Sequence, residues 1–457
     1  MMENENKKII TKSPGKSLLS GGYLILDKSK RGLVINIDTY ISCESFYIIK
    51  ERPKNDIKNN FITFNVNSEY LNQTFNYIVF LESIINDEYE IKISEKNNND
   101  NKWIKNCIIS SLIFYLSFFD FSKNLFNEKE QLEINVVIKS DYRFYSYSKE
   151  NISEKIKTGL GSSSAFINSL TSNLIIIYEK FCRKKNYAKN LIFKDINDKD
   201  LQALILGSCL LSNNLSQNKV GSCFDIISSL FGSQIFIQSQ NNIFFNSPLI
   251  ISQENKDKIN NFIAYLKKEY IPKISFINEK NKYLQSKIYL ISIEIGTDTR
   301  IYVKKVLEYA NSKKKEKLYD DELFSNLNEI NEKIINNFMD ESKEDNYLLL
   351  KQLCIRYRTI LREISQQSKV DIEPKILTPL LDNLIKNDKI IYAICPGAGG
   401  YDSIVIIAKY GIDESELIKD INNIINDFNL ENNNKKLNIK ANLLDVNIAK
   451  IAGTILS

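Results

Sequence analysis

The residue types best suited to binding an anion lie in one segment, Lys157-Thr158-Gly159-Leu160-Gly161-Ser162-Ser163-Ser164-Ala165. Two glycines, three serines and the apolar run that follows predict a loop feeding the N-terminus of a helix. Free N–H groups and the helix dipole favour an anion there, and serine can add a hydroxyl to phosphate or Mg²⁺. The segment matches neither a Walker A loop nor Gly-x-Gly-x-x-Gly. By itself it is more often an ordinary helix start, so other motifs must decide.

A lysine near the start of the chain could complement such an anion. Pro14-Gly15-Lys16 precedes Gly21-Gly22-Tyr23. A Pro-Gly turn could fix Lys16 so that its charge reaches a transferring phosphoryl group, although this motif by itself would more often be structural. The alternative is a turn between strands that carries a surface lysine.

An aspartate follows a short glycine-bearing segment, Gly221-Ser222-Cys223-Phe224-Asp225. The Asp225 carboxylate could coordinate Mg²⁺ or accept a proton from a nucleophile. Ser222 and Asp225 also have the spacing of a helix capping box. Both interpretations stay open at this point.

A third glycine-rich segment, Pro396-Gly397-Ala398-Gly399-Gly400, lies between predicted strands at 390–394 and 404–408. Three glycines in four positions exceed what a hairpin turn needs. Close approach to another loop or to a ligand would explain the excess.

The elements that must position these segments are mixed in type. Hydrophobic periodicity predicts further strands at 32–49, 61–66, 132–138, 233–237, 288–295 and 437–444, and helices at 103–119, 163–183, 199–213, near 222 and at 413–428. Helical patterns dominate from Thr299 to about Gln367. We therefore predict an α+β protein of two domains, residues 1–238 and 239–457.

Composition excludes several classes of protein. The chain of 457 residues contains no histidine, which rules out Ser-His-Asp and Cys-His catalysis, and its seven cysteines form no C-x-x-C pair. The net charge of +5 is small, and no apolar stretch is long enough to span a bilayer. We expect a cytoplasmic protein with reduced, buried thiols that binds neither nucleic acid nor membrane.

The three glycine segments, in this order and at these distances, resemble the three motifs of the GHMP kinase superfamily. Within it the chain most resembles the eukaryotic-type phosphomevalonate kinases. The resemblance covers residues 10 to about 410, with supporting segments at 14–27, 145–146, 157–165, 219–225, 372–374 and 396–402. Three positions depart from the family pattern: Cys223 stands where glycine is usual, Asn213-Asn214 where Ala-His is common, and Ser164 where Ala or Gly is usual.

The resemblance implies an N-terminal domain like the second domain of ribosomal protein S5, a C-terminal ferredoxin-like domain, and ATP and substrate between them. It implies phosphoryl transfer from ATP to 5-phosphomevalonate, with Mg²⁺ as the metal. If the roles of the family's residues apply at the matching positions, Lys16 and Asp225 would be catalytic and Ser162 would bind the metal. The ATP phosphates would lie on Lys157, Thr158, Gly159, Leu160, Gly161, Ser162, Ser163, Ser164 and Ala165. The substrate would contact Tyr23, Tyr145, Ser146, Ser222, Gly399 and Gly400.

The chemistry of this acceptor refines the expectation. A phosphate monoester has a second pKa of about 6, so the nucleophile is largely deprotonated at neutral pH. We therefore expect Asp225 to act through Mg²⁺ or Lys16 rather than as an obligatory general base. The remaining alternatives are a mevalonate kinase, against which Gly21-Gly22-Tyr23 argues, a diphosphomevalonate decarboxylase, and a GHMP-fold binding protein without catalysis. Arg143 and Arg300 are candidates for binding substrate anions, and the oligomeric state stays open.

Overall fold

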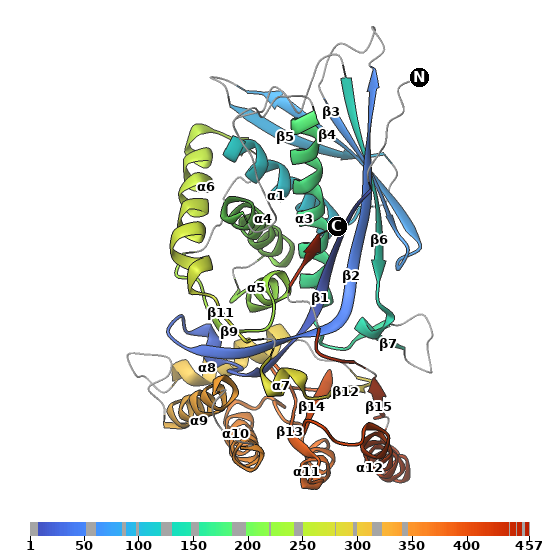
Figure 1. Cartoon of the computed structure of the whole chain (residues 1–457), viewed down its shortest axis with the longest axis vertical. Coiled ribbons are helices and arrows are strands. Elements are labelled where there is room, and N and C mark those ends of the chain that lie inside the picture. The colour runs from blue at the N-terminus through green and yellow to red at the C-terminus, as the bar shows by residue number, and fades with distance from the viewer. Residues whose placement is uncertain are drawn as a thin grey trace.

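Two β-sheets organise the chain in the computed structural model (Figure 1). The structure describes residues 8–51, 61–84, 88–96, 100–119, 130–147, 155–184, 198–218, 221–241, 250–278, 280–295, 299–312, 322–340, 346–437, 439–444, 446–449 and 453–456. Among these residues, no helix combines the length and apolar character needed to cross a membrane.

The larger sheet has the strand order β10-β5-β4-β3-β6-β2-β1-β16, with β9 paired to β2 and β11 paired to β9. Its strands are β1 (Ile9–Ser20), β2 (Arg31–Glu51), β3 (Phe61–Ser68), β4 (Gln73–Ser83), β5 (Tyr89–Glu95), β6 (Glu130–Ser140), β9 (Gln234–Ile237), β10 (Ile250–Ile251), β11 (Ser275–Phe276) and β16 (Ile455–Leu456). Only the β3–β6 pair is parallel among the described strands. A hairpin of β7 (Tyr145–Tyr147) and β8 (Lys155–Lys157) lies beside this sheet.

Helices cover one face of the larger sheet, as Figure 1 shows. They are α1 (Lys102–Phe119), α3 (Ser162–Lys184), α4 (Lys199–Gln217), α5 (Phe224–Phe231) and α6 (Gln253–Tyr265). Alternation in β3 turns Ile62, Phe64 and Val66 into the core, where all three are fully buried. Almost every side chain of α1 from Ile104 onward is buried, which explains its continuous apolar sequence.

The smaller sheet has the order β13-β14-β12-β15 and is antiparallel throughout. Its strands are β12 (Ile288–Ile293), β13 (Ile390–Ile394), β14 (Ser403–Ala408) and β15 (Ala441–Leu444). Its helices are α8 (Thr299–Ser312), α9 (Glu322–Met339), α10 (Tyr347–Ser368), α11 (Thr378–Lys386) and α12 (Glu414–Asn434). This is the β-α-β-β-α-β arrangement of a ferredoxin-like domain, with four helices among the described residues of the first crossover.

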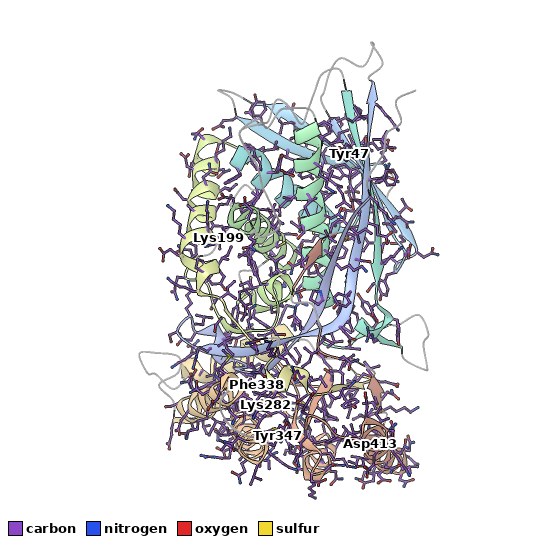
Figure 2. All side chains as sticks on the ribbon, viewed as in Figure 1. Tyr47, Lys199, Lys282, Phe338, Tyr347 and Asp413 are labelled. Atoms are coloured by element: carbon purple, nitrogen blue, oxygen red, sulfur yellow. The ribbon has the colours of Figure 1, made fainter. Side chains whose placement is uncertain are left out.

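Short segments connect the two parts. The single turn α7 (Lys282–Gln285) precedes β12, and the ring of Tyr283 packs at a tilt against that of Phe338 on α9, with centres 4.5 Å apart. Figure 2 shows Lys282, Phe338 and Tyr347 gathered in this region. Turns of 3-10 helix occur at Leu24–Leu26, Tyr142–Phe144 and Ile271–Lys273, and a π-helical turn at Leu266–Tyr270.

The predicted α+β class is confirmed, and the predicted elements are present, although the last strand begins later than expected, at Ala441, and α12 ends later than expected. The strands β4 and β5 and the helix α6 were not predicted. The division after residue 238 stays a prediction. Hydrogen bonding joins β10 to β5, β11 to β9 and β16 to β1, so these later segments belong to the larger sheet. The pairing favours a boundary near residue 287, with the chain end returning to the first domain.

Candidate active site

The central loop leads from β8 into α3, which begins at Ser162, one residue before the predicted start. Gly159 and Gly161 both have left-handed backbones, with φ of 74° and 78°. The Thr158 hydroxyl donates to the carbonyl of Arg143 at 2.9 Å, and Ser164 donates to that of Gly161 at 2.7 Å. These bonds hold the loop while the first N–H groups of α3 remain without intrahelical partners.

Lys16 lies within strand β1, so the predicted Pro-Gly turn is wrong. The β1–β2 ladder continues through it with a register shift between Pro14 and Gly15. At this irregularity the Lys16 backbone N–H donates to the carbonyl of Leu160 at 2.9 Å. A β-carbon on Gly15 would lie only 2.4 Å from the hydroxyl oxygen of Thr39 and 3.1 Å from the Leu160 carbonyl oxygen. The glycine therefore lets the central loop lie directly on the strand.

The Lys16 side chain passes beside the central loop rather than into solvent. Its Nζ lies 3.5 Å from the Gly159 carbonyl oxygen and 4.9 Å from the ring centre of Phe224. A β-carbon on Gly161 would come within 2.7 Å of Lys16 Cε. Burial lowers the pKa of the Lys16 ammonium, and the nearby carboxylates of Asp225 and Asp402 partly counteract this. The surface-lysine alternative is therefore wrong.

Asp225 lies in the first turn of α5, but the capping box is not formed. The N-cap is Cys223, without a capping side-chain bond, and Asp225 Oδ1 accepts the N–H of Ile226 at 3.0 Å. Cys223 has a φ of 58°, and this left-handed residue delays the helix by one position beyond the predicted cap at Ser222. The Asp225 carboxylate remains close enough to Lys16 to be its strongest charged neighbour.

Two of the three departures from the family pattern, at Cys223 and at Asn213-Asn214, contact each other in the structure. The buried Cys223 thiol lies 3.6 Å from Nδ2 of Asn213 and 3.8 Å from Oδ1 of Asn214. Because Cys223 has a left-handed backbone, glycine would adopt this conformation without strain. Asn213 and Asn214 therefore contact the side chain that replaces the glycine.

The third glycine segment packs against the chain on both sides, and the expected close approach is confirmed. The Gly397 N–H donates to the Leu18 carbonyl at 3.1 Å, and the Tyr23 hydroxyl donates to the Ala398 carbonyl at 2.6 Å. A β-carbon on Gly399 would lie 2.0 Å from the Ile372 carbonyl oxygen.

The amides of this segment are largely committed to the protein itself. The N–H groups of Gly399 and Gly400 donate to the carbonyls of Pro396 and Ile372, at 3.1 and 2.9 Å. Substrate contact at Gly399 and Gly400 stays a prediction, and it would have to use groups other than these two donors.

Asp402 belongs to the site, but the sequence analysis assigned it no role, although it lies in the supporting segment 396–402. A β-carbon on Gly159 would lie 3.2 Å from Asp402 Cβ and 3.6 Å from Oδ2. Asp402 therefore approaches the central loop from the smaller domain, while Asp225 approaches Lys16 from the larger one. Its position directly after Gly399-Gly400-Tyr401 was the available signal.

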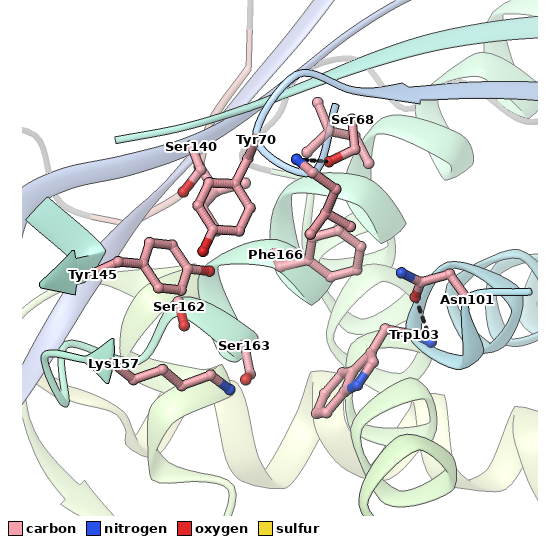
Figure 3. Close-up of a pocket in the computed structure, with 13 residues that line it drawn as sticks. Ser68, Tyr70, Asn101, Trp103, Ser140, Tyr145, Lys157, Ser162, Ser163 and Phe166 are labelled. Atoms are coloured by element: carbon pink, nitrogen blue, oxygen red, sulfur yellow. Dashed lines mark hydrogen bonds between the residues drawn. The ribbon is translucent and has the colours of Figure 1, made fainter. Parts of the chain in front are cut away.

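A hollow of about 620 Å³, its open mouth included, lies beside the start of α3 (Figure 3). Its walls include Lys157, Ser162 and Ser163 of the central loop and four aromatic residues, Tyr70, Trp103, Tyr145 and Phe166. The rings of Tyr70 and Tyr145 stack with centres 4.3 Å apart. Sequence reasoning missed Tyr70, Trp103 and Phe166 because they come from separate elements without a shared motif.

The remaining predicted site residues are distributed around this centre. Tyr23 contacts the third glycine segment, Ser222 lies just before α5, and Ser146 lies in β7. Arg143 pairs with Asp38 and Asp141, at 3.1 and 2.7 Å, which weakens its candidacy for binding a substrate anion. Arg300 is exposed on α8.

Comparisons with known proteins give a consistent result. No family model matches the chain. A phosphomevalonate kinase of Aspergillus fumigatus is 24% identical over 444 residues, which cover 87% of this chain and 86% of that protein. A phosphomevalonate kinase of Candida albicans is 23% identical over 407 residues, covering 86% and 88%.

A solved structure extends the likeness to three dimensions. Streptococcus pneumoniae phosphomevalonate kinase, in complex with phosphomevalonate and AMPPNP, superposes with a TM-score of 0.53 at 14% identity, covering 96% of this chain and 99% of that one. The chain therefore has the fold of the GHMP kinases and is a sequence relative of the phosphomevalonate kinases.

Proposed function

We propose that this protein transfers the γ-phosphoryl group of ATP to 5-phosphomevalonate, giving 5-diphosphomevalonate in the mevalonate route to isoprenoids and sterols. The observation that carries the proposal is the position of Lys16. Its ammonium lies at the central glycine loop, within the electrostatic influence of the carboxylates of Asp225 and Asp402, and is largely buried. A buried cation at a helix N-terminus suits a reaction between two anions.

The nucleoside of ATP would occupy the hollow beside α3. Its stacked tyrosines, Trp103 and Phe166 offer faces for a flat aromatic base, and Lys157 and Ser163 lie at its phosphate end. Lys157, Thr158, Gly159, Leu160, Gly161, Ser162, Ser163, Ser164 and Ala165 would then surround the phosphates. We propose that Tyr145 contacts the nucleotide rather than the acceptor, because it lines this hollow.

Mg²⁺ would be held mainly by the ATP phosphates. Among the described residues, no three Asp, Glu or Cys side chains form a cluster that could hold a metal. A magnesium ion bound by phosphates needs only one or two protein oxygens, and the hydroxyl of Ser162 and the carboxylates of Asp225 and Asp402 are of that kind. When bound, Mg²⁺ supplies charge neutralisation to the phosphate oxygens.

The protein's own residues would do three things. Lys16 would neutralise the charge that moves between the two phosphates. The loop Gly159–Ser164 would hold the donor, while Tyr23, Ser222, Gly399 and Gly400 would line the acceptor side. Asp225 would orient Lys16 rather than remove a proton, because the acceptor is already deprotonated at neutral pH.

The proposal is tested by supplying ATP with each of three acceptors in separate reactions: 5-phosphomevalonate, mevalonate and 5-diphosphomevalonate. We expect ADP release with the first. ADP release only with mevalonate would favour a mevalonate kinase, and carbon dioxide released from 5-diphosphomevalonate would favour a decarboxylase. ATP binding without turnover of any acceptor would favour a binding protein. A cytoplasmic location stays a prediction from cysteine usage.

A further inference from the structure

Two consecutive buried residues of helix α10, Tyr357 and Arg358, bind two different segments near the site. The Tyr357 hydroxyl accepts the backbone N–H of Gly21 at 2.9 Å, which ties the helix to the turn after Lys16. Arg358 points to Glu373 instead, on the segment between α10 and α11. Both residues are 1% exposed, so neither contact competes with solvent.

Glu373 is held from several directions. Arg358 donates to it through Nε at 2.9 Å and through Nη2 at 2.8 Å, and Arg362 donates through Nη1 at 2.9 Å. The Thr378 hydroxyl donates to the same oxygen as Arg362, at 3.1 Å. A paired guanidinium and carboxylate fix each other's plane, so the backbone at Glu373 has little freedom.

Ile372, the residue before Glu373, is hydrogen-bonded to the third glycine segment. The carbonyl oxygen of Ile372 accepts the Gly400 N–H at 2.9 Å, and a β-carbon on Gly399 would lie 2.0 Å from that oxygen. The position of the Ile372 peptide therefore sets the position of residues 399–400. Asp402, which faces the central loop, follows two residues later.

We propose that Glu373, fixed by Arg358 and Arg362, is a positioning residue that holds the third glycine segment in its contacts with Leu18 and Tyr23. The inference rests on the proposed function, because it assigns the effect to the acceptor side of that reaction. A buried ion pair is weak support for a purely stabilising role, since apolar replacements are often equally stable. Its directional bonds are suited to placement.

The test compares Glu373→Gln with Asp382→Asn as a matched control. Asp382 accepts from the same Arg358 nitrogen at 2.7 Å, but its side chain is 47% exposed and it belongs to α11 rather than to the segment that carries Ile372 and Glu373. For Glu373→Gln we expect kcat/KM for 5-phosphomevalonate to fall by about tenfold or more, because small misplacements in a site have large effects. The KM for ATP should change less than twofold, since the hollow beside α3 does not touch this segment. Asp382→Asn should leave both values near those of the wild type.

Hydrogen exchange at peptides covering 396–402 provides a readout that needs no substrate. We expect faster exchange there in Glu373→Gln, and unchanged exchange in Asp382→Asn. Equal loss of kcat/KM for both substrates with unchanged exchange would overturn the proposal, because the loss would then not arise from loosening of residues 396–402. If the wild type turns over no 5-phosphomevalonate, the proposed function fails, and the exchange rates alone still decide the positioning role.

A milder variant guards against misfolding. Arg362→Met removes one of the bonds to Glu373, and its side chain is 34% exposed, so the fold should tolerate the change. It should accelerate exchange at 396–402 in the same direction and to a smaller extent. Unchanged exchange in Arg362→Met together with unchanged exchange in Glu373→Gln would contradict the inference.

Discussion

Replacing Lys16 with methionine removes the central charge and keeps the side-chain stem. The stem packs beside Phe224 and the Gly161 position, so methionine should preserve these contacts. An ammonium about 4 Å from a phosphoryl oxygen contributes about 4 kcal/mol at an effective dielectric constant of about 20. A loss of that size corresponds to about 10³-fold in rate, and removal of a single oxyanion donor typically costs 10²–10³ in kcat. We expect kcat to fall by about 10²–10³ and the KM values to change far less.

The assay is ADP release at saturating ATP and 5-phosphomevalonate, with Lys12→Met as the control. Lys12 is exposed on the same strand, so its replacement should leave kcat unchanged. Thermal unfolding separates charge loss from misfolding. Because burial lowers the pKa of Lys16, its charge costs folding free energy at pH values below the folded-state pKa, and this cost fades as the pH rises toward the pKa of the unfolded chain. Removing the charge should therefore not lower the Tm. A rise in KM alone, or a fall in kcat below tenfold, would refute the reasoning.

Three further predictions follow from the same contacts. Asp225→Asn removes a negative charge that raises the pKa of Lys16, so that pKa should drop further and the fall of kcat at alkaline pH should begin at lower pH. Residual activity that climbs steeply with pH would instead indicate a missing general base. Tyr145→Ala should raise the KM for ATP by about tenfold, because stacking on a base contributes about 1–3 kcal/mol; a rise in the acceptor KM alone would contradict the nucleotide assignment. Cys223→Gly should change the free energy of unfolding by less than about 1 kcal/mol, while Cys223→Val should lower it by more than about 1 kcal/mol, because a β-branched residue is strained in a left-handed conformation. Denaturant unfolding of both cysteine variants measures the difference.

The sequence predicted the elements whose periodicity is strong, and it missed β4, β5 and α6, whose sequences are more polar. Buried alternation in β3 and the apolar run of α1 leave little ambiguity about their type. It also predicted the central loop as a helix start, because glycine and serine act locally there.

The errors arose where a distant segment overrides local preference. Pro14-Gly15 has the composition of a turn, yet the Leu160 carbonyl binds the strand there and the ladder continues with a register shift. Ser222 and Asp225 have the spacing of a capping box, yet the left-handed Cys223 moves the helix start. The hollow could not be found from sequence because Tyr70, Trp103 and Tyr145 come from three elements that meet only in the fold.

Asp402 was missed for the same reason, because its contacts are with segments far away in the sequence. Its relation to Lys16 depends on how the smaller domain packs on the larger one, through contacts such as Gly397 to Leu18 and Tyr392 to Leu19. No local pattern in the chain encodes that approach.

The proposed reaction forms a bond between two phosphates, and phosphorus NMR detects that bond directly. The wild-type protein should convert ATP and 5-phosphomevalonate into ADP and a product with two mutually coupled diphosphate resonances, while the phosphomonoester signal of the acceptor disappears. Lys16→Met at equal concentration should produce these resonances about 10²–10³ times more slowly. Inorganic phosphate without a new diphosphate, or an unchanged rate in Lys16→Met, would contradict the account.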